Sequence, residues 1–308
     1  MQSRALVRHS TECIRGAVAH LLEAQDADGL WRDYALAPGC SEAWTTAWVA
    51  WCLTHFGTRP SIASAVRRAA IALERICTPV GWGYNREAIP DADSTGWAVR
   101  FLCAAGVRPG DQATSCVAEF LDSAGRAHTF RGADQGTWSD AHADVTAIVG
   151  LALLACGADG GLIQRTRSAV VNAQRADGLW TSFWWATDAY AALWSVQFLD
   201  RTGGLNPNVR NRLTQCLSAA SPQGTGLENA LWLSLAIESR NVDLRLTEAL
   251  VACLIEAYLP DGWPGSALLL DPPRFSGDAV SPAGPHSDVR GLISTAMACW
   301  ALARWAAQ

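Results

Sequence analysis

A short element that ends in tryptophan recurs along the chain. Residues 24–31 read Ala-Gln-Asp-Ala-Asp-Gly-Leu-Trp, and residues 173–180 read Ala-Gln-Arg-Ala-Asp-Gly-Leu-Trp. Looser copies end at Trp82, Trp138 and Trp263. Because self-similarity along a chain is typical of architectures that reuse one supersecondary unit, we expect a fold built from a series of similar units.

Two kinds of helix are predicted around each copy. Six segments, five of which follow a copy, are apolar nearly all round: 42–56, 92–105, 141–156, 187–201, 227–239 and 288–305. The segments that precede them have one polar face: 11–24, 61–77, 111–124, 162–174, 206–219 and 243–257. A helix that is apolar on every side has to be buried, whereas an amphipathic helix covers a core from outside.

Six helix–loop–helix units with inner and outer helices predict an all-α fold, a closed (α/α)6 barrel or toroid in which residues 1–308 form a single domain. No strand alternation is visible in the sequence. An open solenoid of the same units is the alternative. The closed form is favoured because neither terminal repeat resembles the polar cap that a solenoid requires.

The composition narrows the class of protein. Half of the 308 residues are hydrophobic, and the net charge of −5 comes from interleaved acids and bases, so no nucleic-acid partner is expected. Most of the ten cysteines lie in apolar segments, which favours reduced core thiols. With no signal-peptide pattern and no apolar run long enough for a membrane span, we expect a cytoplasmic protein, and peripheral membrane contact stays open.

The recurring element resembles the QW motif, Gln-x-x-x-Gly-x-Trp, of squalene–hopene cyclases, oxidosqualene cyclases and class II diterpene cyclases. Gln25 with Trp31 and Gln174 with Trp180 fit this motif fully. The chain is therefore similar to class II terpene cyclases with prenyltransferase–squalene oxidase repeats, as a single-barrel member that corresponds to their catalytic β domain. The resemblance implies that these glutamines and tryptophans hold helices together and catalyse nothing.

A second resemblance concerns chemistry. The run Asp91-Ala92-Asp93-Ser94-Thr95 is similar to the Asp-x-Asp-Asp-Thr motif of class II cyclases, whose middle aspartate protonates an alkene. This likeness assigns the acid to Asp93 and its partner to Asp91, while Ser94 replaces the third acid. The oxidosqualene branch has Asp-Cys-Thr here, so one acid followed by a small polar residue resembles that variant. The alternative is that both aspartates are helix N-caps.

Alkene protonation needs a strong acid in a dry pocket. Two carboxyl groups two residues apart cannot both ionise easily when they are buried, so one pKa rises, although the helix N-terminus opposes this by favouring the anion. When the third repeat is laid on the second, His142 and Asp144 fall where Asp91 and Asp93 fall. We rank them second as catalytic residues, and the alternative for His142 is a helix cap or an exposed loop position.

Aromatic rings on or just before the inner helices are candidates for binding substrate and stabilising carbocations. They are Trp44, Trp48, Trp97, Trp184, Trp185, Tyr190, Trp194 and Trp232. Core packing is the alternative for each of them. If the substrate carries a diphosphate, Arg32, Arg86, Arg131 and Arg290 lie in loops where they could hold it, although a solvated loop charge is the alternative reading.

The predicted function is therefore that of a class II, protonation-initiated terpene cyclase, an isomerase or lyase in isoprenoid biosynthesis. Its expected substrate is a hydrophobic isoprenoid of fifteen to twenty carbons or a prenylated scaffold. No metal ligands and no cofactor are expected, and Mg²⁺ only if the substrate bears a diphosphate. Homodimer formation stays open.

Other functions of this toroid fit less well. Zinc-dependent prenyltransferases and lanthionine cyclases need Asp, Cys and His ligands in patterns that this sequence lacks, and Ala43 replaces the glutamine of a complement-type thioester. The strongest rival is a non-catalytic α-toroid that binds a hydrophobic ligand or a partner protein.

Overall fold

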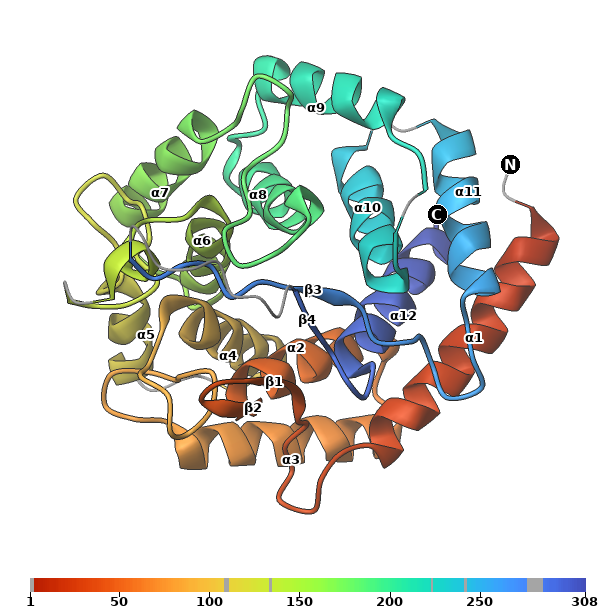
Figure 1. The fold of residues 1–308 in the computed structure, drawn as a ribbon, viewed down its shortest axis with the longest axis horizontal. Coiled ribbons are helices and arrows are strands. Elements are labelled where there is room, and N and C mark those ends of the chain that lie inside the picture. The colour runs from red at the N-terminus through yellow and green to blue at the C-terminus, as the bar shows by residue number, and fades with distance from the viewer. Residues whose placement is uncertain (1–2, 108–110, 133–134, 223, 241–242, 276–284) are drawn as a thin grey trace.

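The computed structural model of the chain describes residues 3–107, 111–132, 135–222, 224–240, 243–275 and 285–308. These residues form two concentric rings of helices, as Figure 1 shows along the barrel axis. The inner ring consists of α2 (Ala43–Leu53), α4 (Ala92–Ala104), α6 (Ala143–Ala155), α8 (Asp188–Thr202), α10 (Gly226–Ser239) and α12 (Leu292–Ala306). Each inner helix contacts the next, and α12 contacts α2, so the barrel is closed and the solenoid alternative is excluded.

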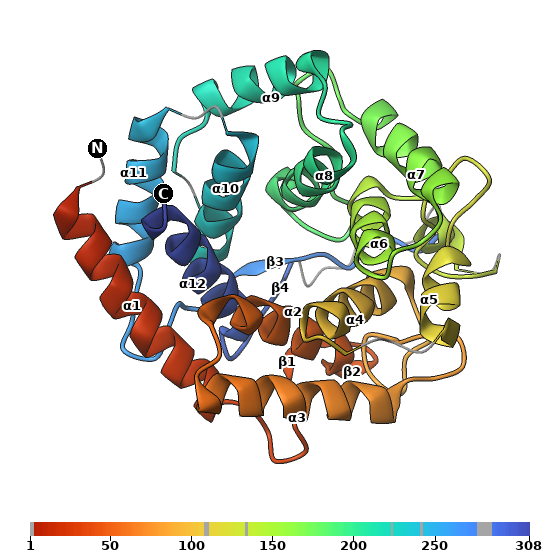
Figure 2. The ribbon, with the colours of Figure 1, turned by 180° about the vertical axis from the view of Figure 1, so that it is seen from behind.

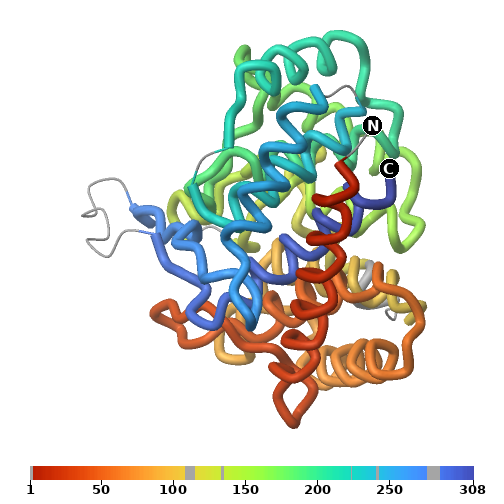
Figure 3. Tube along the Cα trace, turned by 90° about the vertical axis from the view of Figure 1, so that its right-hand side faces the viewer, coloured from red at the N-terminus to blue at the C-terminus, as the bar shows by residue number. Residues whose placement is uncertain are grey.

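The outer ring covers the inner one, as the view from behind in Figure 2 also shows. It consists of α1 (Arg4–Glu23), α3 (Pro60–Ile76), α5 (Asp111–Ala118), α7 (Gly160–Asn172), α9 (Pro207–Ala219) and α11 (Leu244–Glu256). Helix α1 packs on α12 as well as on its outer neighbours α3 and α11. The side view in Figure 3 shows α1 running along the barrel next to the last helices of the chain. The all-α (α/α)6 prediction is confirmed.

Most helix boundaries agree with the sequence prediction within a few residues, and the differences have local causes. Helix α12 begins at Leu292 instead of 288, because Gly291 is left-handed (φ 65°) and its N–H donates to the carbonyl of Asp288. Helix α1 begins earlier than expected, at Arg4, and α5 ends earlier, at Ala118.

The structure also contains short strands that the sequence did not predict. They are β1 (Asp33–Leu36), β2 (Gly39–Ser41), β3 (Ala267–Leu269) and β4 (His286–Ser287), and the loops include the 3-10 helices η1 (Thr54–Phe56) and η2 (Gly136–Ser139). They form two small antiparallel pairs, β1 with β2 and β3 with β4. Strands this short cannot display an alternating pattern, which explains why none was visible.

Four of the five recurring tryptophans join their loop to the outer helix before it. The indole N–H donates to a backbone carbonyl near the end of that helix, from Trp31 to Leu21 (2.7 Å) and from Trp180 to Val170 (2.7 Å). Trp82 and Trp263 make the same bond to Leu73 (2.8 Å) and Leu254 (2.7 Å). A buried indole N–H needs such a partner, so this bond fixes the ring in the wall.

The glutamines of the two complete copies connect consecutive outer helices. The amide of Gln25 donates to the carbonyls of Gly29 and Ala65, and the amide of Gln174 donates to those of Gly178 and Val209. Ala65 lies in α3 and Val209 in α9, so each glutamine ties its own loop to the next outer helix. These contacts agree with the structural role that the resemblance implied.

The loop copies are also tied to the inner helices. The hydroxyl oxygen of Thr95 in α4 accepts from the backbone N–H of Trp82 (3.0 Å), and Thr295 in α12 accepts from Trp263 (3.0 Å). Gly81 precedes Trp82 with φ +113°, and a Cβ there would lie 2.4 Å from the Thr95 hydroxyl oxygen. Glycine is therefore required both by the backbone conformation and by the close approach.

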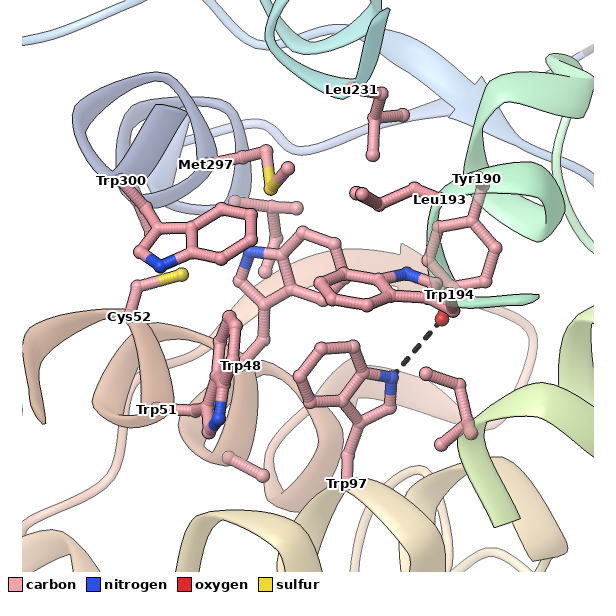
Figure 4. Close-up of a cluster of buried hydrophobic side chains, with 14 of the residues drawn as sticks. Trp48, Trp51, Cys52, Trp97, Tyr190, Leu193, Trp194, Leu231, Met297 and Trp300 are labelled. Atoms are coloured by element: carbon pink, nitrogen blue, oxygen red, sulfur yellow. Dashed lines mark hydrogen bonds between the residues drawn. The ribbon is translucent and has the colours of Figure 1, made fainter. Parts of the chain in front are cut away.

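The middle of the barrel is filled by tryptophans, as Figure 4 shows. Ring centroids lie 4.7 Å apart for Trp48 and Trp97, 5.0 Å for Trp97 and Trp194, and 5.0 Å for Trp51 and Trp300. These five rings, which we call the aromatic plug, are all buried. Because these large rings pack against one another, the aromatic plug fills the barrel across its middle. A hollow remains at each end.

Candidate active site

A cavity of about 470 Å³ lies at the end of the barrel where the inner helices begin. Its wall is mostly apolar and comes from the β1–β2 hairpin, the loops before α4, α6 and α8, and strand β3. The lining residues are Leu36, Ala37, Pro38, Trp44, Tyr84, Glu87, Ala88, Ile89, Asp91, Asp93, Thr129, Phe130, Gln135, Trp138, Trp184, Trp185, Leu269 and Asp271. This volume is within the range of small-molecule sites, which is about 300–1,000 Å³.

Residues 267–275, which we call the strap, cross this end of the barrel, and Figure 1 shows β3 in front of the inner helices. The strap pairs with the segment before α8, where the Leu270 N–H donates to the Trp184 carbonyl and the Ala186 N–H to the Leu268 carbonyl, both at 2.8 Å. On the other side, the indole of Trp138 donates to the carbonyl of Pro272 (2.7 Å). The strap therefore covers part of the cavity.

Asp93 lies in the first turn of α4 and lines the cavity. Its Oδ2 accepts a hydrogen bond of 2.7 Å from the indole N–H of Trp44. Its Oδ1 is buried and has no hydrogen-bond partner among the residues that the structure describes. A charged carboxylate would leave that oxygen unsatisfied, so this geometry favours the neutral acid.

The surroundings of Asp93 raise its pKa well above the usual value, first because of burial and then because of the nearby charges of Asp91 and Asp144. The hydrogen bond from Trp44 opposes this shift, since it favours the anion, and the nearby hydroxyl of Tyr190 acts in the same direction. Asp93 is only half-buried, but the surface that it exposes faces an apolar cavity and not bulk water. The carboxyl group is therefore held as a neutral acid at the cavity wall.

Asp91 is the N-cap of α4, and its Oδ1 accepts from the backbone N–H of Ser94 (2.7 Å). Burial raises the pKa of Asp91 to about 6, and hydrogen bonds from Ser94 oppose that shift. The N-cap alternative thus describes Asp91, whereas Asp93 lies inside the helix and caps nothing. Asp91 also lines the cavity, so the two carboxyl groups share one site.

Asp144 occupies the equivalent place in α6, but its contacts differ. It is buried, and its Oδ2 accepts from the backbone N–H groups of Phe183 (2.9 Å) and Trp184 (3.2 Å). Burial raises the pKa of Asp144 to about 6. Asp144 does not line the cavity, and its contacts hold in place the segment that carries Trp184 and Trp185.

His142 precedes α6 at the N-cap position and is half-buried. Its ring stacks on Phe183 with centroids 3.6 Å apart, and its Nε2 lies 3.0 Å from the carbonyl oxygen of Thr137. Burial lowers the pKa of His142, which favours the neutral ring. His142 is not among the cavity residues, so the structure does not place it beside Asp93 as the alignment of repeats suggested.

The eight predicted aromatic residues occupy three places. Trp44, Trp184 and Trp185 line the cavity. Beneath them lie Tyr190, which stacks on Trp185 at 4.5 Å and accepts from the indole of Trp97 at 3.0 Å, and the plug residues Trp48, Trp97 and Trp194. Trp232 is half-buried on α10 and does not line the cavity.

Several cavity residues escaped the sequence analysis because they lie in loops without periodicity, among them Tyr84, Thr129 and Phe130. Trp138 was identified only as a loose repeat copy. Its indole bonds to the strap and not to the preceding outer helix, and its ring faces the cavity. This copy departs from the complete motif, and that departure could have identified Trp138 as a cavity residue.

The four arginines considered for a diphosphate are all engaged elsewhere. Arg32 binds Asp26, Asp28 and Glu42, and Arg86 binds Glu42. Arg131 pairs with Glu119, and Arg290 donates to the carbonyls of Arg32 and Ala24. None of the described cavity residues is basic, and four of them carry carboxyl groups (Glu87, Asp91, Asp93 and Asp271).

Within the described ranges, no three His, Cys, Asp or Glu side chains cluster closely enough to hold a metal ion. Over the same ranges, no helix combines the length and apolar character that a membrane span requires.

Similar folds occur in solved structures. MstE, a type II terpene cyclase from Scytonema, matches with a TM-score of 0.85 at 25% identity over 98% of this chain and 99% of that chain. A variant of MstE in complex with geranylgeranyl dihydroxybenzoate, its substrate, matches with the same TM-score at 22% identity over 99% of both chains. ent-Copalyl diphosphate synthase from Streptomyces platensis matches at 0.63 and 21% identity over 84% of this chain and 50% of that one.

No family model matches the sequence, and no curated protein matches it. The full-length agreement with MstE shows that this chain has the fold of a single-barrel type II terpene cyclase. Because fold alone does not decide the reaction, the function has to be argued from the site.

Proposed function

We propose that this chain is a class II terpene cyclase, which protonates a linear isoprenoid and converts it into a cyclic product through carbocations. The main support is the position of Asp93, a carboxyl group with a raised pKa, in the wall of an apolar, aromatic cavity. Residues 1–308 are proposed to act as one catalytic domain, in line with the full-length match to MstE.

In the proposed reaction, the O–H proton of Asp93 passes to one carbon of an alkene. The π electrons form the new C–H bond, and the other carbon becomes a carbocation. Further π bonds attack this cation and close the rings, until a base removes a proton from a neighbouring carbon and leaves an alkene. One proton enters and one leaves, so the product is an isomer of the substrate and no cofactor takes part in the chemistry.

The two neighbours of Asp93 assist different stages of the proton transfer. Before the transfer, the carboxyl group of Asp91, whose pKa is about 6, carries negative charge at neutral pH and keeps the proton on Asp93. After the transfer, the N–H of Trp44 stabilises the new carboxylate through its 2.7 Å hydrogen bond. Asp144 is proposed to position the wall, and His142 has no direct contact with the cavity.

The aromatic wall supplies electrostatic stabilisation for the cations. The faces of Trp44, Trp184 and Trp185 border the cavity, and a cation within about 6 Å of such a ring is stabilised by its quadrupole. Tyr190 and the aromatic plug form the floor below them, so ring closure takes place against indole surfaces.

The proposed substrate is an isoprenoid of fifteen to twenty carbons or a prenylated scaffold. The cavity of about 470 Å³ is suited to one such chain. Structures of MstE variants contain geranylgeranyl dihydroxybenzoate as the substrate and merosterolic acid A as the product, and this substrate is a prenylated scaffold. The acidic lining favours a head group other than a diphosphate, and Mg²⁺ would take part only if a diphosphate is bound.

The test is an incubation in D₂O with prenylated aromatic compounds, farnesyl and geranylgeranyl diphosphates and their epoxides, read by mass spectrometry. The wild type should form a cyclised product that carries one deuterium, and Asp93→Asn should form none. As a control, Asp288→Asn removes another buried carboxyl group that does not line the cavity, and it should keep activity. An Asp93→Asn variant as active as wild type would exclude Asp93 as the acid and leave Asp91, the carboxyl group beside it in the cavity wall, as the next candidate.

A non-catalytic toroid that binds a hydrophobic ligand or a partner protein is the second candidate. The observation in its favour is the filled centre of the barrel, which leaves only the hollows at its two ends for a ligand. In that case the prenylated compounds would bind, as seen by calorimetry, without turnover by the wild type or any variant.

A further inference from the structure

A second hollow lies at the opposite end of the barrel, where α2, α4, α6 and α8 end, and Figure 2 views the molecule from this side. Its volume is about 590 Å³, and it is separated from the first cavity by the aromatic plug. Its wall contains two arginines, Arg100 and Arg201, together with His55 and apolar side chains, and none of the described lining residues is acidic.

Arg100 is an unusual residue for a barrel interior, because only 3% of it is exposed. Its guanidinium carbon lies 4.0, 4.7 and 4.4 Å from the ring centroids of Trp51, Trp97 and Trp194. Its Nη2 donates to the side-chain oxygen of Gln197, and its buried Nη1 has no hydrogen-bond partner in the described part of the chain. A buried charge with an unsatisfied donor is costly unless an anion compensates it.

Arg201 lies near the end of α8, and its charge is close enough to Arg100 to lower the pKa of that guanidinium, after burial as the larger cause. The carboxylates of Glu238 and Asp200 act on the charge of Arg201, and each already pairs with another arginine. Arg304 lies 2.9 Å from Glu238, and Arg240 lies 2.7 Å from Asp200. Two guanidinium groups thus border one hollow and repel each other.

His55 adds no negative charge to this group. Its Nδ1 lies 3.0 Å from the carbonyl oxygen of Trp51, and burial lowers its pKa. Leu151 and Leu154 contribute an apolar part of the wall, and an ion pair beside apolar side chains is stronger than one in bulk water.

We propose that this hollow is a second ligand site, which binds an oxyanion (a phosphate or a carboxylate) through Arg100 and Arg201. Guanidinium groups match the geometry of such anions and bind them with charge-assisted hydrogen bonds. Arg100 provides the buried donor Nη1, and Arg201 provides the charge at the mouth. The site is independent of the proposed cyclisation, because it requires no reaction at Asp93.

The same residues connect this site to the floor of the first cavity. Arg100 stacks on Trp97, and the indole of Trp97 donates to the hydroxyl of Tyr190, which stacks on Trp185 in the cavity wall. An anion at Arg100 therefore contacts the far side of the plug, and we expect its binding to change the indole environments of Trp51, Trp97 and Trp194.

The test is isothermal titration calorimetry of the full chain with inorganic phosphate, diphosphate, acetate and succinate, and with chloride as the reference. At least one of the four oxyanions should bind saturably, and whether a phosphate or a carboxylate binds more tightly identifies the ligand class. Arg201→Ala should weaken binding at least tenfold, and Arg100→Gln should abolish it. Arg245→Ala, which removes an exposed arginine that does not line the hollow, should leave it unchanged.

Arg201 is exposed, so its replacement keeps the test valid even if Arg100→Gln does not fold. In parallel, the anion should shift indole N–H resonances in a ¹⁵N spectrum of the wild type but not of Arg201→Ala. The proposal is overturned if none of the oxyanions binds above the chloride reference, or if Arg201→Ala and Arg245→Ala bind as the wild type does.

Discussion

The hydrogen bond from Trp44 to Asp93 offers a quantitative test of the proposed acid. Trp44→Phe keeps an aromatic face at the cavity but removes the N–H that lies 2.7 Å from Asp93 Oδ2. This bond favours the carboxylate, so its loss raises the pKa of Asp93 further and makes the group a weaker acid. A hydrogen bond to a charged group contributes about 1.5–3 kcal/mol, and each 1.36 kcal/mol changes a rate about tenfold.

We therefore expect the rate of cyclisation by Trp44→Phe to fall between about tenfold and about a hundredfold, if the proton is largely transferred in the transition state. The assay is single-turnover cyclisation at saturating substrate, with KM measured separately and expected to change little. The matched control is Trp184→Phe. Trp184 also lines the cavity, but its indole donates to Thr129 at 3.2 Å and not to Asp93.

Two results would refute this reasoning. If Trp44→Phe turns over at the wild-type rate, the N–H does not stabilise the conjugate base. If Trp184→Phe slows the reaction equally, the effect comes from the shape or π surface of the wall and not from the acid. A melting temperature close to that of the wild type is required for both variants, because Trp44 is buried.

Two further predictions concern stability. Gln174→Ala removes the hydrogen bonds to Gly178 and Val209 from a buried site, and we expect the free energy of unfolding to fall by about 1–3 kcal/mol in a urea titration. Gln25→Ala should cost less, because Gln25 is less buried. Equal losses in the two variants would contradict this reasoning. Burial raises the pKa of Asp288 to about 7, well above its value in the unfolded chain. Between about pH 4 and 7 the folded state therefore binds more protons than the unfolded state. The free energy of unfolding should increase as the pH falls through that window, by up to about 1.4 kcal/mol per pH unit. Asp288→Asn should flatten this profile, and an unchanged slope would show that Asp288 is not the titrating group.

The repeated element allowed the fold to be predicted from the sequence. Three of the copies, which end at Trp31, Trp82 and Trp263, make the same set of local contacts. Each has a glycine with positive φ, a tryptophan that bonds to the helix before it and a threonine in the helix after it, as in Gly81, Trp82 and Thr95. Because these contacts are nearly local, the pattern of residues predicts them without knowledge of the tertiary structure. The closed ring was predicted because neither terminal repeat resembles the polar cap that a solenoid requires.

The position of Asp93 was also accessible from the sequence, because its place in the first turn of α4 follows from the helix boundary. The identity of its hydrogen-bond donor could not be predicted from the sequence. Trp44 comes from a different repeat and contacts Asp93 only when α2 and α4 pack together. For the same reason His142, aligned with Asp91 by repeat register, stacks on Phe183 and stays outside the cavity.

The sequence by itself determined six hairpins, which helices are inner and which outer, and an acidic residue at the start of the second inner helix. The tertiary structure decided what fills the barrel. Side chains from α2, α4, α8 and α12 meet at its centre, and their combined volume closes the middle and leaves two hollows of opposite charge. Burial of Arg100 and the neutral state of Asp93 both result from that packing. The free-energy cost of a charge depends on the solvent and the dipoles around it. Those surroundings come from several helices, so no single segment of the sequence determines them.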